Sequence, residues 1–345
     1  MRFFNLFKQE LAIDLGTANT LIIQNDQVVV DEPSIVAIDR KTEETIAVGR
    51  RAMQMHEKTH DNINTVRPLK DGVIADFRAA EHMIKGMIEM IGSKRPFFTH
   101  LKMVICIPSG ITEVEKRAVF ESAARVDSKE TYLIHEPMAA ALGIGLDVEE
   151  PVGNMIVDIG GGTTEIAVIA LSGIVCDQSI RVAGDEFTDN IVQHMRRQHN
   201  ILIGERTAEQ IKINVGSALT ELDNPPPEYA VNGRDLLNGI PRQITVTYQE
   251  IAEALDESIV SIEEAVIRAL ETTPPELASD IYSTGLYLTG GGAMLRGLDK
   301  RLSKKTQLPV HVAEDPLTAV VRGTSKALSD TDRFKAILIP ASSVS

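Results

Sequence analysis

Short apolar runs of the β type alternate with turns through the first third of the chain, which is typical of an α/β domain. These runs cover residues 11–15, 20–24, 28–30 and 34–38. Between about Asp76 and Ile91 the apolar residues recur at helical spacing instead. The strand-like run "KMVICIPSG" then leads to a helix, and the spacing of Thr112 and Glu115 predicts a capping box at its start.

The second half of the chain repeats this plan. We expect strands over residues 155–170 and helices near 187–198 and 207–218. A strand pair around 229–247 precedes a long helix over about 248–270, and "LYLTGGGAMLRGL" predicts a strand, a glycine turn and a helix. The pattern therefore predicts a duplicated α/β fold, in which ligands bind at the carboxyl ends of strands.

Two segments, "AIDLGTANTLII" and "VDIGGGTTEIAV", carry the same motif, Asp-[Leu/Ile]-Gly-x-x-x-Thr, at the end of an apolar run. Glycine-rich turns leave backbone N–H groups unobstructed, and consecutive N–H groups bind anions. Two facing turns of this kind would hold a polyphosphate. Asp14 and Asp158 would then hold Mg²⁺ beside it, because Mg²⁺ takes carboxylate and phosphate oxygens together. A pair of ordinary tight turns is the alternative, and the repetition argues against it.

Composition narrows the classes of function. A chain of 345 residues favours two domains, and a net charge of −14 argues against a nucleic-acid partner. Cys106 and Cys176 lie in apolar runs and are expected to be buried thiols in a reducing cytoplasm. No apolar segment reaches bilayer-spanning length, and the N-terminus lacks the features of a signal peptide. We therefore expect a cytoplasmic protein.

Two further signals are weaker on their own. A third glycine turn, at residues 290–293, could be a plain corner between a strand and a helix. Glu209 and Lys212 stand three positions apart on one helix face, where a solvated salt bridge is the ordinary explanation and a nucleoside contact the alternative. No P-loop motif occurs, and no G-x-G-x-x-G follows the first strand.

Five segments together resemble the nucleotide site of the actin, sugar kinase and heat-shock chaperone superfamily. They are the two Asp-Gly turns, "HEPMAAALG", "GERTAEQIK" and "LTGGGAMLRGLD". With "DGVIADF" and "PPELASDI" they resemble one branch closely, the bacterial actin family of MreB and Mbl, from about Leu11 to Gly323. The resemblance implies the actin-like, duplicated ribonuclease-H-like α/β fold, with two lobes, four subdomains and ATP with Mg²⁺ in the cleft.

The resemblance also implies subdomain bounds, with a membrane-binding amphipathic segment at the start. That segment is residues 1–10; subdomain IA is 11–31, 66–146 and 322–345; IB is 32–65; IIA is 147–181 and 249–321; IIB is 182–248.

Site residues carry over from the family by position. The phosphate turns correspond to Thr17, Ala18, Asn19, Gly161, Gly162 and Thr163; the adenosine contacts to Glu209 and Lys212; the loop under adenine and the α-phosphate to Gly291, Gly292, Ala293 and Met294. Asp14 and Asp158 resemble the residues that hold Mg²⁺, largely through waters. Glu136 resembles the residue that orients the attacking water, with Thr163 as a second catalytic contact. Favourable charge at a helix N-terminus is the alternative role for Glu136.

Two departures from the family pattern lie near Glu136. His135 stands where the family usually has an acidic residue, and "ARVDSKETY" replaces a glycine-containing approach to that strand. Neither departure touches a phosphate contact, so we expect a competent site with slow ATP hydrolysis.

Three functions share this superfamily fold. A sugar kinase needs a second substrate pocket, for which the sequence offers no loop, and a chaperone needs a peptide-binding domain, for which the length leaves no room. The resemblance therefore implies a filament-forming ATPase that maintains rod cell shape and organises cell-wall synthesis. Its implied partners are other copies of itself, in head-to-tail protofilaments that pair into double filaments, and membrane-embedded cell-wall elongation proteins.

Aromatic side chains gather in two short stretches where polar residues are the norm. The apolar residues of these stretches are Phe3, Phe4, Leu6, Phe7, Phe97 and Phe98. One interpretation is that both clusters pack into the first lobe. The other, which the family resemblance favours, is that they insert into the inner face of the cell membrane, with neighbouring Lys and Arg residues beside them.

Overall fold

Two mixed β-sheets with the same strand order form the centre of the molecule. A computed structural model describes residues 8–56, 58, 61–92 and 100–343 of the chain. The first sheet has the order β3 (Gln27–Pro33), β2 (Asn19–Gln24), β1 (Lys8–Leu15), β9 (His100–Ile107), β10 (Ser128–His135) and β19 (Ile339–Pro340). The second has the order β13 (Gly173–Ile180), β12 (Thr164–Ala170), β11 (Asn154–Ile159), β17 (Leu286–Thr289) and β18 (Val310–Val312). Each sheet begins as an antiparallel meander and continues with two parallel strands; in the first sheet the short edge strand β19 then pairs antiparallel with β10.

The duplication extends to strand register. Leu15 pairs with Thr20 in the first sheet, and Ile159 pairs with Thr164 in the second. Each hairpin therefore closes through four residues, which we name the first turn (16–19) and the second turn (160–163). Asp14 and Asp158 occupy the same position, one residue before the end of their strands. The predicted duplicated α/β fold is confirmed.

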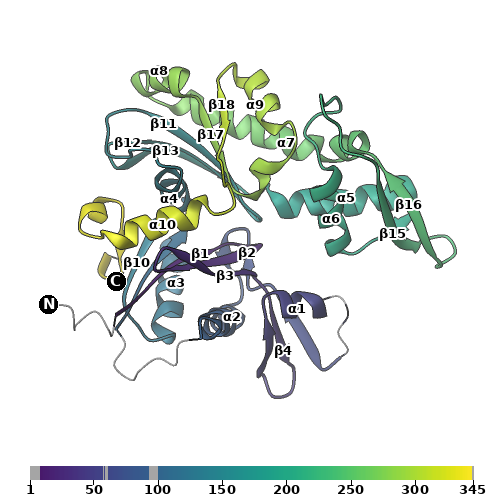
Figure 1. Cartoon of the computed structure of the whole chain (residues 1–345), viewed down its shortest axis with the longest axis horizontal. Coiled ribbons are helices and arrows are strands. Elements are labelled where there is room, and N and C mark those ends of the chain that lie inside the picture. Colours follow the sequence, from purple (N-terminus) through teal and green to yellow (C-terminus); the bar gives the residue numbers. More distant parts are fainter. Residues whose placement is uncertain (1–7, 57, 59–60, 93–99, 344–345) are drawn as a thin grey trace.

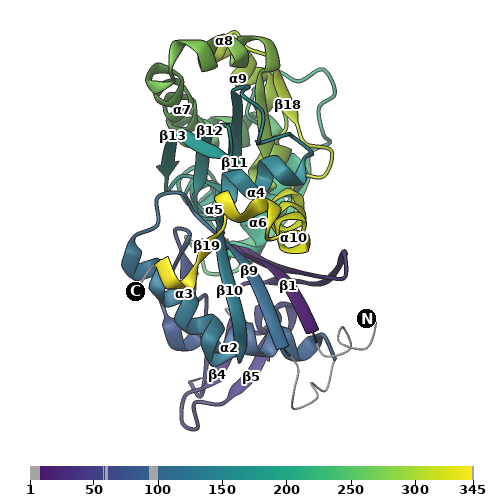
Figure 2. The ribbon, with the colours of Figure 1, turned by 90° about the vertical axis from the view of Figure 1, so that its left-hand side faces the viewer.

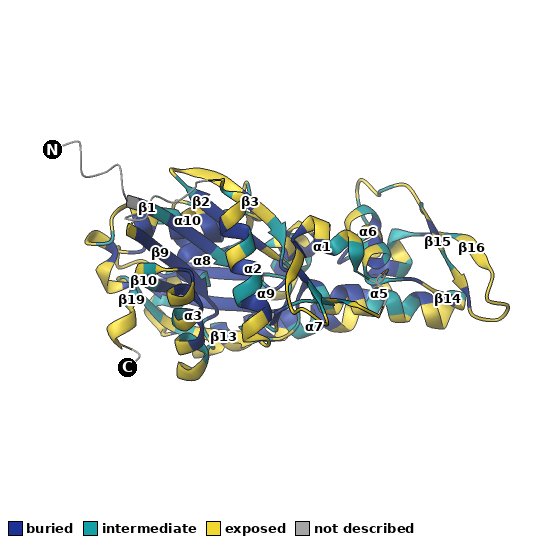
Figure 3. Ribbon diagram, turned by 90° about the horizontal axis from the view of Figure 1, so that it is seen from below, coloured by how far each residue is buried: buried dark blue, intermediate teal, exposed yellow. Residues whose placement is uncertain are grey.

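Helices cover the sheets and separate them. They are α1 (Arg50–Met55), α2 (Phe77–Met90), α3 (Glu113–Arg125), α4 (Glu136–Gly143), α5 (Gly184–His199), α6 (Glu205–Val215), α7 (Tyr248–Thr272), α8 (Pro275–Thr284), α9 (Leu298–Thr306) and α10 (Ala319–Ser329), with 3₁₀ turns η2 (Gly291–Met294), η3 (Arg333–Ala336) and η4 (Ala341–Ser343). Helices α2 and α3 share a buried core with the first sheet, and α5 to α9 share one with the second. Figure 1 shows the resulting two lobes, and Figure 3 shows how fully the central strands are buried.

Helices α4 and α10 lie between the two large sheets and join the lobes (Figure 2). Their buried residues share one apolar core with strands from both sheets. The helices cross at Gly143 and Gly323, where only glycine fits. A Cβ on Gly143 would lie 1.8 Å from the carbonyl oxygen of Ala319, and one on Gly323 would lie 1.7 Å from that of Ala139. The lobes are therefore connected by direct backbone contact.

Each lobe carries a smaller sheet at its outer end. In the first lobe this sheet has the order β5 (Thr45–Val48), β4 (Val36–Asp39) and β6 (Ile63–Val66); in the second it has β14 (Ile201–Leu202), β15 (Tyr229–Asp235) and β16 (Pro241–Val246). A two-stranded hairpin, β7 (Leu69–Lys70) and β8 (Val73–Ile74), leads from the first of these sheets toward the cleft.

Most predicted elements are present, with a few differences. The capping box of Thr112 and Glu115 is formed at the start of α3. The glycine turn after β17 continues as the 3₁₀ turn η2, and the α-helix begins only at Leu298. Cys106 is buried as predicted, but Cys176 is only half-buried, because β13 presents alternate residues to solvent.

The N-terminal segment also differs from its predicted bounds. Strand β1 begins at Lys8, so the predicted amphipathic segment at residues 1–10 overlaps a strand of the first sheet. The six residues predicted to contact a membrane all lie outside the described residues. Within the described part of the chain, no helix combines the length and apolar character needed to cross a bilayer.

Candidate functional site

The first and second turns face each other in van der Waals contact. A Cβ on Gly161 would lie 2.6 Å from the Cβ of Ala18, and one on Gly162 would lie 2.7 Å from the Oγ1 of Thr17. Side chains at these two glycines would therefore push the turns apart. The two copies of the motif, 144 residues apart in sequence, form one site at the carboxyl ends of β1 and β11.

Main-chain donors remain free in both turns. In the described part of the chain, the N–H groups of Thr17, Ala18, Gly161 and Gly162 donate to no protein acceptor. Buried or half-buried N–H groups normally have a partner, so a run of free ones indicates a site for an anion. The sequence predicted this property of the turns.

The hairpin between β7 and β8 closes one side of the two turns. The Gly72 N–H donates to the Thr17 Oγ1 at 3.0 Å, and a Cβ on Gly72 would lie 3.1 Å from the Cγ2 of Thr163. The sequence analysis missed this contribution. Its local signal was the Asp71-Gly72 dipeptide, a frequent hairpin turn with positive φ, as both residues have here.

Helices α5 and α6 adjoin the second turn. The N–H of Gly184 donates to the carbonyl oxygen of Gly160 at 3.1 Å, and the Lys212 Nζ donates to that of Gly184 at 2.7 Å. Lys212 also pairs with Glu209 at 2.7 Å, and the Lys212 side chain is only 16% exposed. The pair therefore lies beside the turn, which argues against an ordinary solvated salt bridge.

The third turn, residues 290–294, packs against the end of β11. Gly290 has a φ of 78°, and a Cβ there would lie 2.9 Å from the Asp158 Oδ1. Gly292 and Ala293 are buried against this strand end, whereas Met294 is exposed. Of the four predicted contacts in this turn, Met294 is thus the one whose side chain is open to a ligand.

Four carboxyl groups gather beneath the turns: Asp14, Glu136, Asp158 and Glu165. Burial raises the pKa of Asp14 to about 6, although the Cys106 thiol lowers it by donating to the Oδ1 at 3.1 Å. Burial likewise raises the pKa of Asp158 to about 7, against the hydrogen bond that Thr289 donates at 2.7 Å. The pKa of Glu136 is raised well above its usual value by burial and by the other three carboxylates.

Glu165 is a functional candidate that the sequence analysis missed. It is fully buried, is the register partner of Asp158, and accepts hydrogen bonds from the hydroxyl groups of Ser109 and Ser179. Its only sequence signal is a single charge inside the apolar run "TEIAVIA". Buried acids are rarely retained without a partner, so this position belongs with the predicted acidic residues.

The carboxyl cluster fits a divalent cation. Among the described residues, no Lys or Arg forms an ion pair with any of the four carboxyl groups. Mutual repulsion in a buried site costs stability unless a positive charge offsets it. Carboxylate oxygens beside an anion site are the donors that Mg²⁺ takes, so the residues present are consistent with Mg²⁺.

Comparisons with known proteins identify the family of this chain. The family model described as "MreB/Mbl protein" matches residues 8–336. The chain is 49% identical over 336 residues to the cell shape-determining protein MreB of Escherichia coli K12, covering 96% of both chains. It is 45% identical to the cell shape-determining protein Mbl of Bacillus subtilis 168, covering 95% of this chain and 98% of the relative. The chain belongs to the MreB/Mbl family.

A solved MreB/Mbl structure supports the fold as well. MreB5 of Spiroplasma citri, in a crystal structure bound to AMPPNP, matches with a TM-score of 0.88 and 38% identity, covering 94% of this chain and 97% of that one. The actin-like fold predicted from the sequence is therefore confirmed.

His135, next to Glu136, does not add charge to the site. Burial lowers the pKa of His135, so its imidazole is neutral near pH 7. The Nδ1–H donates to the carbonyl oxygen of Pro108 at 3.3 Å. This bond holds His135 to the loop after β9, next to the Ser109 that bonds Glu165.

We predict that the metal-free protein loses stability as the pH rises. Asp158 has a pKa of about 7 in the folded protein and an ordinary pKa of 3.8, so the folded state binds its proton more tightly. The stability that this group contributes is complete below about pH 4 and is lost between pH 4 and 7, by a few kcal/mol. Asp158→Asn should reduce this loss, measured by urea unfolding in a chelator at pH 5 and pH 8.

Asp177→Asn provides the control, because Asp177 is an exposed aspartate of β13. This variant should show the same difference in the free energy of unfolding between pH 5 and pH 8 as the wild type. If Asp158→Asn lost as much stability between pH 5 and pH 8 as the wild type does, Asp158 would not be the carboxyl group that causes the loss.

Proposed function

We propose that this MreB/Mbl protein binds ATP in the cleft, assembles into actin-like filaments and determines cell shape by organising cell-wall synthesis. The observation that carries the proposal is the pair of facing turns with free N–H groups above a buried carboxyl cluster. The family membership and the AMPPNP-bound relative support the same assignment.

Each group of residues has a role in this proposal. The N–H groups of Thr17, Ala18, Gly161 and Gly162 bind phosphate oxygens, with Asn19 and the hydroxyl of Thr163 as further contacts. Glu209 and Lys212 face the adenosine, and Met294 in the third turn lies under the adenine. Hydrolysis then depends mainly on positioning and on neutralising charge.

Glu136 orients the attacking water, assisted by Thr163, and its raised pKa suits a group that accepts a proton. Asp14 and Asp158 would hold Mg²⁺, which supplies positive charge against the phosphates. Glu165 is a positioning residue: its hydrogen bonds to Ser109 and Ser179 fix the loop after β9 against the second lobe. The expected outcome is slow ATP hydrolysis coupled to the state of the polymer.

The predicted subdomain division agrees with the arrangement of the sheets. We propose that the two large sheets belong to IA (11–31, 66–146 and 322–345) and IIA (147–181 and 249–321). The two small sheets would belong to IB (32–65) and IIB (182–248). An ion pair of 3.1 Å between Arg67 and Glu205 joins the two lobes. We propose that a nucleotide bound between the lobes favours a closed, assembly-competent arrangement.

Assembly provides the direct test of the proposed function. We expect the purified protein to form sedimentable polymer with ATP and Mg²⁺, because a head-to-tail contact that does not close generates filaments. Negative-stain microscopy should show paired protofilaments. A protein that stays monomeric over a wide concentration range, with lipid present, would contradict the proposal, and glucose phosphorylation in a coupled assay would favour a sugar kinase.

We also propose peripheral attachment to the inner face of the cell membrane. The described strands β1 and β9 are parallel neighbours, and Lys8 pairs with His100. In the sequence, the two aromatic stretches shortly precede these two paired residues. Weak insertion by one subunit would be strengthened by multivalency in a filament, where membrane-embedded cell-wall proteins would also bind.

Liposome flotation tests this attachment. We expect wild-type filaments to float, and Phe3/Phe4/Phe7→Ser or Phe97/Phe98→Ser variants to remain largely in solution while still polymerising, because each buried Phe contributes roughly 1.5–3 kcal/mol. Flotation of a variant with both clusters replaced, at the wild-type level, would mean that the aromatic residues are core residues.

A further inference from the structure

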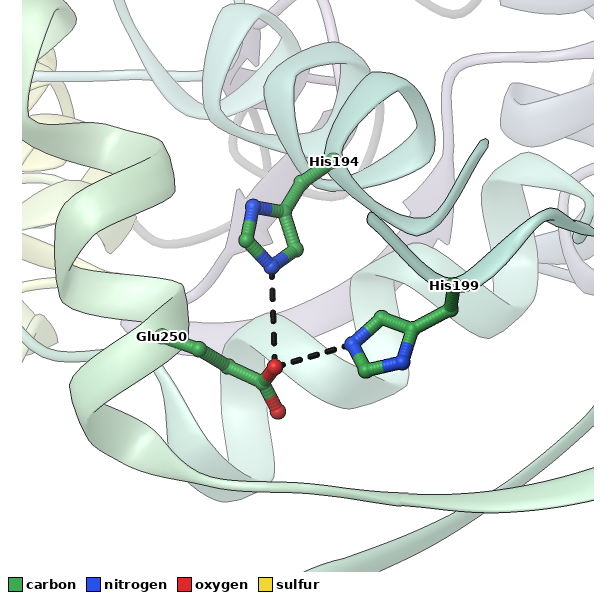
Figure 4. Close-up of side chains that lie close together, drawn as sticks. All are labelled: His194, His199 and Glu250. Carbon is green, nitrogen blue, oxygen red and sulfur yellow. Dashed lines mark hydrogen bonds and ion pairs between the residues drawn. The ribbon is translucent and has the colours of Figure 1, made fainter. Parts of the chain in front are cut away.

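Two histidines and one glutamate converge at the junction of α5 and α7 (Figure 4). His194 and His199 lie near the end of α5, and Glu250 lies in the first turn of α7. The Glu250 Oε2 lies 2.9 Å from the His199 Nε2 and 3.6 Å from the His194 Nε2. Since α5 begins at the second turn and rises about 1.5 Å per residue, this cluster is roughly 20 Å from the phosphate turns.

Only one of the two histidines in this cluster is hydrogen-bonded to Glu250. The Glu250 Oε1 accepts the N–H of Thr247 at 2.6 Å in the capping box of α7, so the Oε2 is the oxygen available to the histidines. His199 bonds to it, but among the described residues the buried His194 Nε2 makes no hydrogen bond, since its 3.6 Å contact with the Oε2, dashed in Figure 4, is too long for one. The side chain of His194 is only 13% exposed, so water contributes little. A buried polar atom without a partner is unfavourable, so a ligand at this nitrogen would stabilise the fold.

The positions of the three atoms suit a tetrahedral metal ion. All three ligand atoms lie within 4.8 Å of one another. Zn²⁺ bonds histidine nitrogen and carboxylate oxygen at about 2.0–2.2 Å, which places neighbouring ligands of a tetrahedron roughly 3.3–3.5 Å apart. The distances of 2.9 and 3.6 Å to the Oε2 bracket this separation.

We propose that His194, His199 and Glu250 form a Zn²⁺ site, with the fourth position open to water. The two imidazole ligands favour Zn²⁺ over Mg²⁺, whereas the all-carboxylate cluster suits Mg²⁺, so the two sites differ in the cation they take. A bound ion would satisfy the His194 Nε2 and cross-link the end of α5 to the start of α7. Its function is to fix α5, whose other end holds the second turn through Gly184.

Calorimetric titration of the whole, chelator-treated chain with ZnCl₂ tests the site. Excess Mg²⁺ is included to occupy the carboxyl cluster. We expect one Zn²⁺ per chain, and at least tenfold weaker binding by His194→Ala, His199→Ala and Glu250→Gln. The glutamine keeps the oxygen that caps α7, so Glu250→Gln should fold normally. Thermal unfolding should show that Zn²⁺ stabilises the wild type and not the variants.

His100→Ala provides the matched control. His100 also lies 3.6 Å from a glutamate oxygen, that of Glu130, but it is not part of the cluster of His194, His199 and Glu250. The variant should bind Zn²⁺ as the wild type does. Co²⁺ in place of Zn²⁺ should give the strong visible absorption of a tetrahedral site. The proposal is overturned if the wild type shows no saturable Zn²⁺ binding, or if folded Glu250→Gln and His194→Ala both bind as tightly as the wild type.

Discussion

Glu136→Gln is expected to lower the rate of ATP hydrolysis by roughly 10² to 10⁴-fold while leaving nucleotide affinity nearly unchanged. Glutamine has the same shape but cannot accept a proton, and it orients a water less strongly than a carboxylate does. Glu136 lies at the first position of α4, among three other carboxyl groups, and makes none of the proposed phosphate contacts. Phosphate release and binding of a fluorescent ATP analogue would be measured separately.

Glu186→Gln is the control that shows whether Glu136 acts in catalysis or only through its charge at a helix N-terminus. Glu186 is an exposed acidic residue in the first turn of α5, so it has the same favourable position relative to a helix N-terminus. We expect this variant to hydrolyse ATP at the wild-type rate. If Glu136→Gln also released phosphate at that rate, Glu136 would have only the electrostatic role.

Gly323→Ala is expected to destabilise the protein by at least about 3 kcal/mol, or to prevent folding. The new Cβ would lie 1.7 Å from the carbonyl oxygen of Ala139, a backbone atom that cannot rotate away. Helices α4 and α10 would have to separate, which would open the core shared by both sheets. Urea unfolding of the purified protein would measure the loss. The direction is unusual, because alanine in a helix is normally about 1 kcal/mol better than glycine.

Gly86→Ala in α2 is the matched comparison for this substitution. A Cβ on Gly86 would meet the methyl groups of Val48 at 2.8 Å, and a side chain can shift where a backbone cannot. We expect a clearly smaller loss of stability. Equal losses of stability at the two positions would show that the close backbone contact between α4 and α10 is no less tolerant of a Cβ than an ordinary side-chain contact.

The parts of the fold that could be predicted from the sequence depend on local patterns. The two Asp-Gly turns repeat within segments of twelve residues, and the capping box of α3 needs only Thr112 and Glu115. The same turns supplied most of the candidate site, because free N–H groups follow from the glycines themselves.

The features that were missed depend on contacts between distant residues. The role of Glu165 depends on Ser109, in the loop after β9, and on Ser179 of β13, which both bond to it. Gly143 and Gly323 precede and follow the second lobe in the sequence, and the residues around each of them do not indicate that the two helices cross there. Likewise, His199 and Glu250 meet only after α5 and α7 have packed together.

Strand β1 sets a constant distance between its first residue, Lys8, and Asp14 beside the phosphate turns. It begins at Lys8, which is paired with His100, and reaches Asp14 after six further residues, a distance of about 20 Å. Each of these two paired residues shortly follows one aromatic stretch in the sequence. Leu11, Ala12 and Ile13 between Lys8 and Asp14 are buried, and parallel pairing with β9 prevents this length from changing. A subunit held to a bilayer by its aromatic stretches, with β1 pointing away from the lipid, would therefore keep its phosphate turns well clear of the lipid head groups. ATP and ADP could then exchange without crossing the charged membrane surface.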